Sequence, residues 1–127
     1  MIDKSDKSLL IIEDEPDLME FYLLFIESEF KWKNLYSATN GNEAKHILKT
    51  KEVDVVISDY KLPDYDGLEL LKKMHDKNVK IPKYIFITGY DSAKFRKAVM
   101  LLGVATILKK PLGDKALDEL KKRLKIA

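Results

Sequence analysis

Residues 53–67 read VDVVISDYKLPDYDG, and this stretch decides the fold. Its first six residues are mostly β-branched and apolar, which predicts a short buried strand from Val53 to Ser58. The residues from Leu62 to Gly67 include the turn formers proline, aspartate and glycine, so they predict a loop. A helical spacing of apolar residues follows at Leu68, Leu71 and Met74. The stretch is therefore a βα unit, and Asp59 lies directly past the end of its strand.

The same alternation of short apolar runs and longer amphipathic segments continues on both sides of this unit. Further strands are predicted at residues 8–12, 35–38, 83–87 and 104–108. Helices are predicted from Pro16 onward, at 41–51, at 91–102 and after Gly113, with Asn40 as one N-cap and Gly103 as one C-terminal left-handed residue. Five strands interleaved with five helices need right-handed crossovers. The fold class is therefore α/β, a parallel sheet with helices on both faces.

Length and composition limit the chain to one domain. The 127 residues are 46% hydrophobic and contain no cysteine, so one core is expected and no disulfide framework is available. We expect a single domain over residues 1–127, in which about residues 1–7 form a polar N-terminal tail. These first residues do not form a signal peptide, and the apolar runs are too short for a membrane span. The sequence predicts a soluble, cytoplasmic protein.

The net charge of +2 hides an uneven distribution along the chain. Residues 1–90 carry 13 basic and 17 acidic side chains, whereas residues 91–127 carry 10 basic and 4 acidic ones. A basic C-terminal third is typical either of a surface that binds an acidic partner or of a solvated lysine-rich helix face. Both interpretations stay open from charge alone.

Several chemically active side chains lie at the predicted strand ends. In an open α/β sheet, ligands bind outside the carboxyl ends of the strands. Glu13 and Asp14 follow the first strand and Asp59 the third, so three carboxylates would repel one another without a cation. Oxygen ligands with room for water suit Mg²⁺. Thr88 and Lys110 end the fourth and fifth strands, where a hydroxyl and an ammonium group could bind a phosphoryl group.

Five motifs in order resemble the receiver domains of bacterial response regulators. They are Glu13-Asp14 before Glu15-Pro16, the helix start from Ala38 to Ala44, the run from Asp59 to Gly67, the pair Thr88-Gly89, and Lys110-Pro111. Each motif alone is weak, but all five at family spacing cover almost the whole chain. The resemblance implies a flavodoxin-like, doubly wound (βα)5 fold with strand order 2-1-3-4-5.

The resemblance also implies a role for each site residue. Asp59 would be the phosphoacceptor, whose carboxylate attacks phosphorus to form an acyl phosphate. Asp14 and Asp59 would bind Mg²⁺ (or Mn²⁺) directly, Glu13 would bind it through a water, and the backbone carbonyl of Lys61 would be a further ligand. Thr88 and Lys110 would contact the phosphoryl oxygens. The Lys-Pro bond is typically cis in the family, which would direct Lys110 toward the site.

By the same resemblance, the protein is a switch and not a turnover enzyme. The donor would be the phosphohistidine of a sensor histidine kinase or a histidine phosphotransfer protein. The output face would be formed by the fourth helix, the fifth strand and the fifth helix. Lysines outnumber acidic residues there, which predicts a protein target with an acidic docking surface. Direct binding to nucleic acid or membrane is not expected. We expect no DNA-binding or catalytic output domain within residues 1–127, which fits either a stand-alone receiver or a piece of a longer protein.

Two positions depart from common family patterns, and two others bear on the phosphoryl lifetime. Glu13 replaces the commoner aspartate but still supplies oxygen, whereas Ile107 stands where many receivers carry an aromatic switch residue. The signal is therefore expected to travel through Thr88 and the Tyr90 loop into the fourth helix. The resemblance also implies that the side chains of Lys61 and Tyr90 control how easily water reaches the acyl phosphate. Both are bulky and neither can act as a general base at neutral pH, which predicts a long-lived phosphoryl group.

Two other functions use some of the same residue types, but the sequence favours the receiver interpretation over both. A phosphatase of the haloacid-dehalogenase type needs a second aspartate two residues after its nucleophile, where this chain has Lys61. A phosphorylation-independent scaffold would not need the complete set of site residues. His46 and His75 have no acid or nucleophile motif beside them and are interpreted as surface residues.

Overall fold

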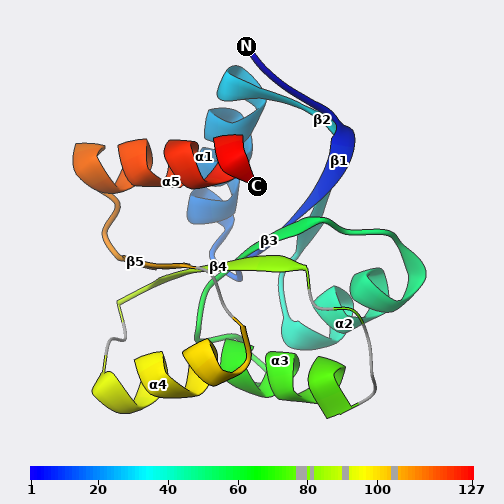
Figure 1. Cartoon of the computed structure of the whole chain (residues 1–127), viewed down its shortest axis with the longest axis vertical. Coiled ribbons are helices and arrows are strands. Elements are labelled where there is room, and N and C mark those ends of the chain that lie inside the picture. Colours follow the sequence, from blue (N-terminus) through cyan, green and yellow to red (C-terminus); the bar gives the residue numbers. More distant parts are fainter. Residues whose placement is uncertain (77–79, 81, 90–91, 104–105) are drawn as a thin grey trace.

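The computed structural model describes residues 1–76, 80, 82–89, 92–103 and 106–127. Within these residues, strands and helices alternate along the chain (Figure 1). The elements are β1 Ile2–Ile12, α1 Pro16–Glu29, β2 Phe30–Ala38, α2 Gly41–Thr50, β3 Val55–Ser58, α3 Gly67–Asp76, β4 Lys83–Thr88, α4 Ala93–Leu101, β5 Thr106–Lys109 and α5 Asp114–Ile126.

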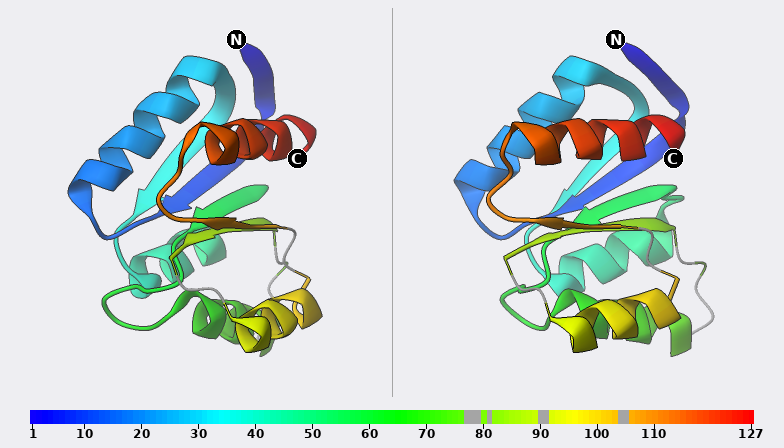
Figure 2. Two further views of the ribbon diagram at one scale, coloured as in Figure 1. Left: turned by 90° about the vertical axis from the view of Figure 1, so that its left-hand side faces the viewer. Right: turned by 60° about the vertical axis from the view of Figure 1, so that its left-hand side comes forward.

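The strands form one parallel sheet in the order β2-β1-β3-β4-β5. The order predicted from the family resemblance is confirmed. Helices α1 and α5 cover one face of the sheet, and α2, α3 and α4 cover the other (Figures 1 and 2). The order reverses at β1, so the carboxyl ends of β1 and β3 lie side by side at one edge of the sheet.

Two apolar layers enclose the sheet. One layer contains Tyr22 and Ile26 of α1 with Leu120 and Leu124 of α5, and the other contains residues of α2, α3 and α4. All four residues of β3 are buried, which fits the unbroken apolar run from Val55 to Ile57 in place of an alternating pattern. The prediction of a parallel sheet with both faces covered is therefore confirmed.

The N-terminal residues differ from their prediction as a polar tail. β1 begins at Ile2, and residues 2–4 pair in parallel with Phe30, Lys31 and Trp32 before an irregularity between Lys4 and Ser8. Lys4 Nζ also donates to the carbonyl oxygen of Ala127 at 2.9 Å. Asp3, Ser5 and Asp6 are exposed although the backbone of residues 2–4 pairs with β2, so polarity alone wrongly predicted a tail at residues 2–7. Strand β2 is accordingly longer than residues 35–38.

Local interactions explain some of the helix boundaries. Asn40 Oδ1 accepts from Glu43 N at 2.8 Å at the start of α2, which confirms the predicted N-cap. Gly103 has a φ of 82°, the left-handed conformation predicted for the end of α4. Helix α4 begins at Ala93 within the described residues, whereas Asp91 of the predicted helix and Val104 of the predicted fifth strand lie outside them.

One core prediction on α1 is wrong. The helical spacing of Leu18, Phe21, Tyr22 and Phe25 predicts that Phe21 lies in the core, but the residue is 43% exposed. The buried positions of α1 are Met19, Tyr22 and Ile26, which share a face that Phe21 flanks.

No helix in the described part of the chain combines the length and the apolar character that a membrane crossing requires.

Candidate functional site

The strand ends bring the predicted site residues to one edge of the sheet. Glu13 and Asp59 each follow the last residue of a strand, and their positions are set by backbone hydrogen bonds that extend the ladder by one residue. Glu13 N donates to Ala38 O at 3.0 Å, and Asp59 N donates to Ile12 O at 3.1 Å. On the other side, Lys110 N donates to Thr88 O at 3.0 Å. Residues far apart in sequence therefore converge because the ladder continues.

Three carboxylates form the acidic part of the site. Oxygen atoms of Glu13, Asp14 and Asp59 all lie within 4.8 Å of one another, and among the described residues no other cluster of this kind is found. Glu13 is buried, Asp59 is partly buried and Asp14 is exposed. Burial raises the pKa of Glu13, although hydrogen bonds from Lys110 and from the Glu15 backbone oppose the increase. The cluster has the donor chemistry of a hard divalent cation.

Lys110 contacts two of the three carboxylates. Its Nζ donates to Asp59 Oδ2 at 2.7 Å and to Glu13 Oε1 at 2.9 Å. Burial alone would lower the pKa of Lys110, but the hydrogen bonds to Asp59 and Glu13 raise it above its usual value, so the side chain is cationic at neutral pH. The bond between Lys110 and Pro111 is cis, as the family resemblance implied, and Lys109 is exposed.

The backbone around Asp59 is held by contacts that the sequence did not indicate. Tyr60 N donates to Asp59 Oδ1 at 2.7 Å, and Ser58 Oγ donates to Asp59 O at 2.8 Å. Gly67 approaches closely from the start of α3: a Cβ there would lie 3.0 Å from Asp59 O and 2.5 Å from the ring of Phe86. A glycine at the end of a turn motif signals this kind of close approach, but only the fold shows what it approaches.

An open hollow of about 340 Å³ lies beside Asp59. It is lined by Asp59, Lys61, Thr88, Gly89 and Lys110. Thr88 is 2% exposed at the end of β4, whereas the side chain of Lys61 is exposed. The structure therefore brings the predicted nucleophile, hydroxyl and ammonium groups to one cavity. Tyr90, which was predicted to shield the site, lies outside the described residues.

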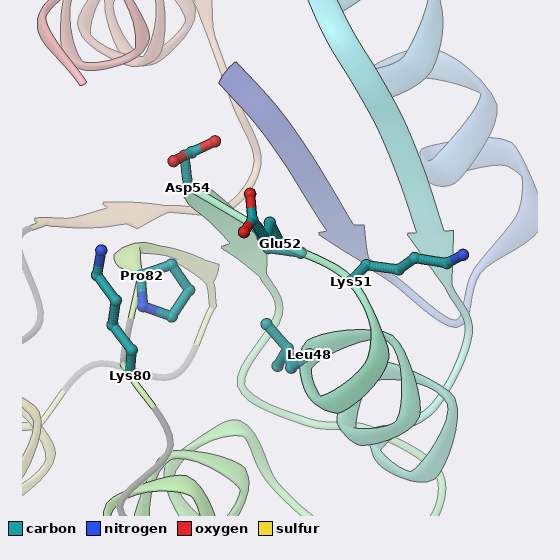
Figure 3. Close-up of a pocket in the computed structure, with 7 residues that line it drawn as sticks. Leu48, Lys51, Glu52, Asp54, Lys80 and Pro82 are labelled. Atoms are coloured by element: carbon teal, nitrogen blue, oxygen red, sulfur yellow. The ribbon is translucent and has the colours of Figure 1, made fainter. Parts of the chain in front are cut away.

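A second hollow, of about 370 Å³, lies at the opposite edge of the sheet (Figure 3). Its lining includes Lys51, Glu52, Asp54 and Lys80, but these side chains do not converge on one point, and Lys51 points away from the others (Figure 3). Asp54 Oδ2 already accepts from Ser8 N at 2.8 Å. This hollow has mixed charge and structural polar contacts, so the edge that carries Asp59 is the better candidate site.

A sequence model described as the response regulator receiver domain matches residues 9–124. The chain belongs to the response regulator receiver family. Receiver domains are switch-like regulators that accept a phosphoryl group in two-component signalling. The family assignment made from the five motifs is confirmed. His46 and His75 of this receiver are exposed on α2 and α3, as expected for surface residues.

Curated relatives of this receiver include longer regulators. The uncharacterized transcriptional regulatory protein YesN of Bacillus subtilis is 32% identical over 107 residues, which cover 84% of this chain and 29% of YesN. Response regulator SaeR of Staphylococcus epidermidis is 28% identical over 109 residues, which cover 86% of this chain and 46% of SaeR. The chain thus spans less than half the length of these relatives.

Solved receiver structures share the fold. A CheY-like receiver domain protein of Methanospirillum hungatei superimposes with a TM-score of 0.80 at 26% identity, covering 94% of each chain. The receiver domain of a LuxO repressor protein of Vibrio parahaemolyticus gives a TM-score of 0.83 at 22% identity, covering 94% of this chain and 88% of that one. The second likeness concerns the fold alone.

Proposed function

We propose that this receiver accepts a phosphoryl group on Asp59 from a phosphohistidine. The observation that carries the proposal is the convergence of Asp59, Lys110 and Thr88 on one open hollow beside a three-carboxylate cluster. A carboxylate oxygen of Asp59 attacks phosphorus, and the P–N bond to the donor imidazole breaks. The imidazole keeps the bonding electron pair and takes up a proton. The product is an acyl phosphate on Asp59.

Lys110 and Thr88 would stabilise the transferred group. Lys110 carries its charge 2.7 Å from Asp59 Oδ2, so its ammonium group lies where negative charge accumulates during transfer. Thr88 is buried at the next strand end, where its hydroxyl can donate to a phosphoryl oxygen. Thr88 ends β4 and Lys110 directly follows β5, so neither group lies on a long loop, which limits reorganisation during the reaction.

The acidic cluster fits a magnesium ion. Asp14 and Asp59 would be direct ligands, Glu13 would act through a metal-bound water, and the backbone carbonyl of Lys61 would complete the protein ligands. The exposure of Asp14 leaves room for the waters that Mg²⁺ keeps, and Mn²⁺ could take its place. When bound, the ion would neutralise charge on the carboxylates and on the phosphoryl oxygens.

The proposed partners follow from this chemistry and from the surface charge. A sensor histidine kinase or a histidine phosphotransfer protein would supply the phosphoryl group. Downstream, the exposed lysines of α4 and α5 favour a protein with an acidic docking surface, and its association rate should fall as salt rises. These lysines are Lys94, Lys97, Lys115, Lys122 and Lys125. Lys121 of α5 is not counted among them, because its Nζ lies 2.7 Å from Glu29 Oε2 of α1.

Intact mass spectrometry after incubation with acetyl phosphate tests the proposal. We expect a phosphoryl adduct on the wild-type protein that needs Mg²⁺ and disappears in Asp59→Asn. Asp54→Asn is the matched control, because Asp54 precedes the same strand at its opposite end and should not change the adduct. An adduct that is equal in Asp59→Asn, or indifferent to chelator, would reject the proposal, and no adduct at all would favour the scaffold.

A further inference from the structure

Tyr60 connects the proposed phosphoacceptor to helix α4 through an aromatic contact. Its ring meets that of Phe95 edge-on, with centroids 4.7 Å apart and planes at 79°. Phe95 is 3% exposed on α4 and also packs edge-on against Phe86 of β4 at 5.5 Å. A buried ring of this kind cannot move without its neighbours, because protein interiors are close-packed. A displacement of the Tyr60 ring would therefore be felt by α4.

Both backbone polar groups of Tyr60 form hydrogen bonds at or next to the site. Its N–H donates to Asp59 Oδ1 at 2.7 Å, and its carbonyl accepts from Gly67 N at 2.6 Å at the start of α3. Its hydroxyl lies 3.3 Å from Asp66 Oδ2, while Asp66 Oδ1 accepts from Glu69 N at 2.7 Å. The residue thus contacts Asp59, the first turn of α3 and a buried ring of α4.

The hydrogen bond from Tyr60 N depends on the chemical state of Asp59. An ionised carboxylate accepts charge-assisted hydrogen bonds that are about twice as strong as neutral ones. Phosphorylation turns one carboxylate oxygen into the bridging oxygen of an acyl phosphate and leaves the other as a neutral carbonyl. The bond to Tyr60 N must therefore weaken or change direction when the group arrives, and the ring is attached to the same residue.

We propose that Tyr60 couples the state of Asp59 to the position of α4. The inference rests on the proposed phosphorylation of Asp59. The aromatic ring that transmits the signal would belong to Tyr60, the residue after the phosphoacceptor, because the fifth strand carries Ile107 in place of an aromatic switch residue. Ile107 is partly buried against the same apolar layer as Tyr60 and Phe95, and it has no ring to rotate. Coupling of this kind is reciprocal, so a change at Phe95 must also alter binding at Asp59.

Amide NMR with beryllofluoride and Mg²⁺ as the phosphoryl mimic tests the inference. In the wild-type protein, we expect shifts both around Asp59 and Lys110 and along residues 93–101. Tyr60→Leu should keep the shifts around Asp59 and Lys110 but lose most of those in residues 93–101. Tyr60→Phe should respond like the wild type, because it keeps the ring. Tyr36→Leu is the matched control, since Tyr36 is a partly buried tyrosine against the same layer.

The reciprocal measurement uses the other side of the contact. Phe95→Leu should change the apparent affinity for beryllofluoride about fivefold or more, the lower end of typical coupling, while Tyr36→Leu leaves it unchanged. A wild-type protein that binds no beryllofluoride would reject the proposed function itself. A Tyr60→Leu protein that binds it with unchanged shifts in residues 93–101 would reject Tyr60 as the coupling residue. If Tyr60→Leu fails to fold, an unchanged beryllofluoride affinity of Phe95→Leu would likewise reject Tyr60 as the coupling residue.

Discussion

Lys110 and Asp59 form an ion pair of 2.7 Å although 51 positions separate them in sequence. The same Nζ lies 2.9 Å from Glu13 Oε1, so one ammonium group contacts two carboxylates at the edge of the sheet and offsets part of their charge. The side chains of Glu13 and Asp59 are only 2% and 14% exposed, which means that water compensates them poorly. In the protein without a metal ion, the positive charge of Lys110 reduces the repulsion between these two carboxylates.

Removing Lys110 should therefore destabilise the protein in the absence of Mg²⁺. Breaking a fully buried ion pair costs about 3–5 kcal/mol, and the partial exposure of Lys110 reduces our expectation for Lys110→Ala to about 1–3 kcal/mol. Urea unfolding followed by the fluorescence of Trp32 measures the difference. Lys109→Ala is the control, because Lys109 is exposed. Equal stability of the two variants would contradict the role given to Lys110.

Magnesium should raise the melting temperature of the wild-type protein. The ion would bind the carboxylates of the folded state and not the unfolded chain, and an ion concentration of tenfold its Kd stabilises by about 1.4 kcal/mol. Asp14→Ala should reduce the increase, whereas Asp17→Ala, an exposed aspartate in the first turn of α1, should retain it. Thermal scans with millimolar Mg²⁺ or chelator measure both. An increase that is unaffected by Asp14→Ala would argue against this metal site.

Gly67→Ala should disturb the protein by overpacking. The added methyl group would lie 2.5 Å from the Phe86 ring and 3.0 Å from the backbone oxygen of Asp59, so one of them must shift. Overpacking of this kind typically costs about 1–3 kcal/mol. Gly89→Ala is the control for stability, because a methyl group there meets no atom within 4 Å. Denaturant unfolding of both variants checks the expectation, and a Gly67→Ala protein as stable as Gly89→Ala would contradict it.

Asp64 should make stability depend on pH at the acidic end. Its carboxylate accepts from Gly41 N and Asn42 N, each at 2.8 Å, so the loop after β3 caps helix α2. Burial alone would raise the pKa of Asp64, but these N–H donors lower it below 3.8. Because the pKa of Asp64 is lower in the folded than in the unfolded protein, its ionised carboxylate stabilises the fold above pH 3.8. This stabilisation is lost as the pH falls through the pKa of the folded protein.

The variant Asp64→Ala should cost about 1 kcal/mol at neutral pH, as the loss of a cap typically does. It should also unfold with a weaker dependence on pH below about 4 than the wild-type protein. Asp118→Ala, at an exposed position of α5, controls for the loss of one surface charge. Denaturant unfolding at pH 7 and at pH 3 measures the free energy of unfolding of each protein. If the difference between Asp64→Ala and wild type is the same at both pH values, Asp64 is not a source of the pH dependence.

The phosphoryl group on Asp59 should be long-lived. The side chain of Lys61 lies at the hollow beside Asp59 and offers no general base to an attacking water at neutral pH. The double variant Lys61→Asn with Tyr90→Glu should therefore lose the group faster than the wild type. Phosphoryl decay after removal of the donor, followed by intact mass, provides the rate. An unchanged rate would show that neither side chain controls access of water.

Local patterns in the sequence predicted most of the elements and named the residues that the structure brings together at the candidate site. The apolar run before Asp59 predicts a buried strand, and the strand-end rule for α/β sheets places Glu13, Asp59 and Lys110 at one edge. The cap at Asn40 and the left-handed Gly103 were equally predictable, because each depends on a few neighbouring residues. The extension of β1 over residues 2–7 was missed, because the pairing of residues 2–4 depends on the neighbouring strand β2 and not on their own polarity.

By itself, then, the sequence determined which residues could form the site and in which kind of fold, since hydrophobic periodicity and turn chemistry act over short distances. Only the tertiary structure decided how these residues meet. The contact of Tyr60 with Phe95, the approach of Gly67 to Asp59 and the cap of α2 by Asp64 join separate elements. Such contacts depend on how elements pack in three dimensions, and no local pattern in a single sequence specifies that packing.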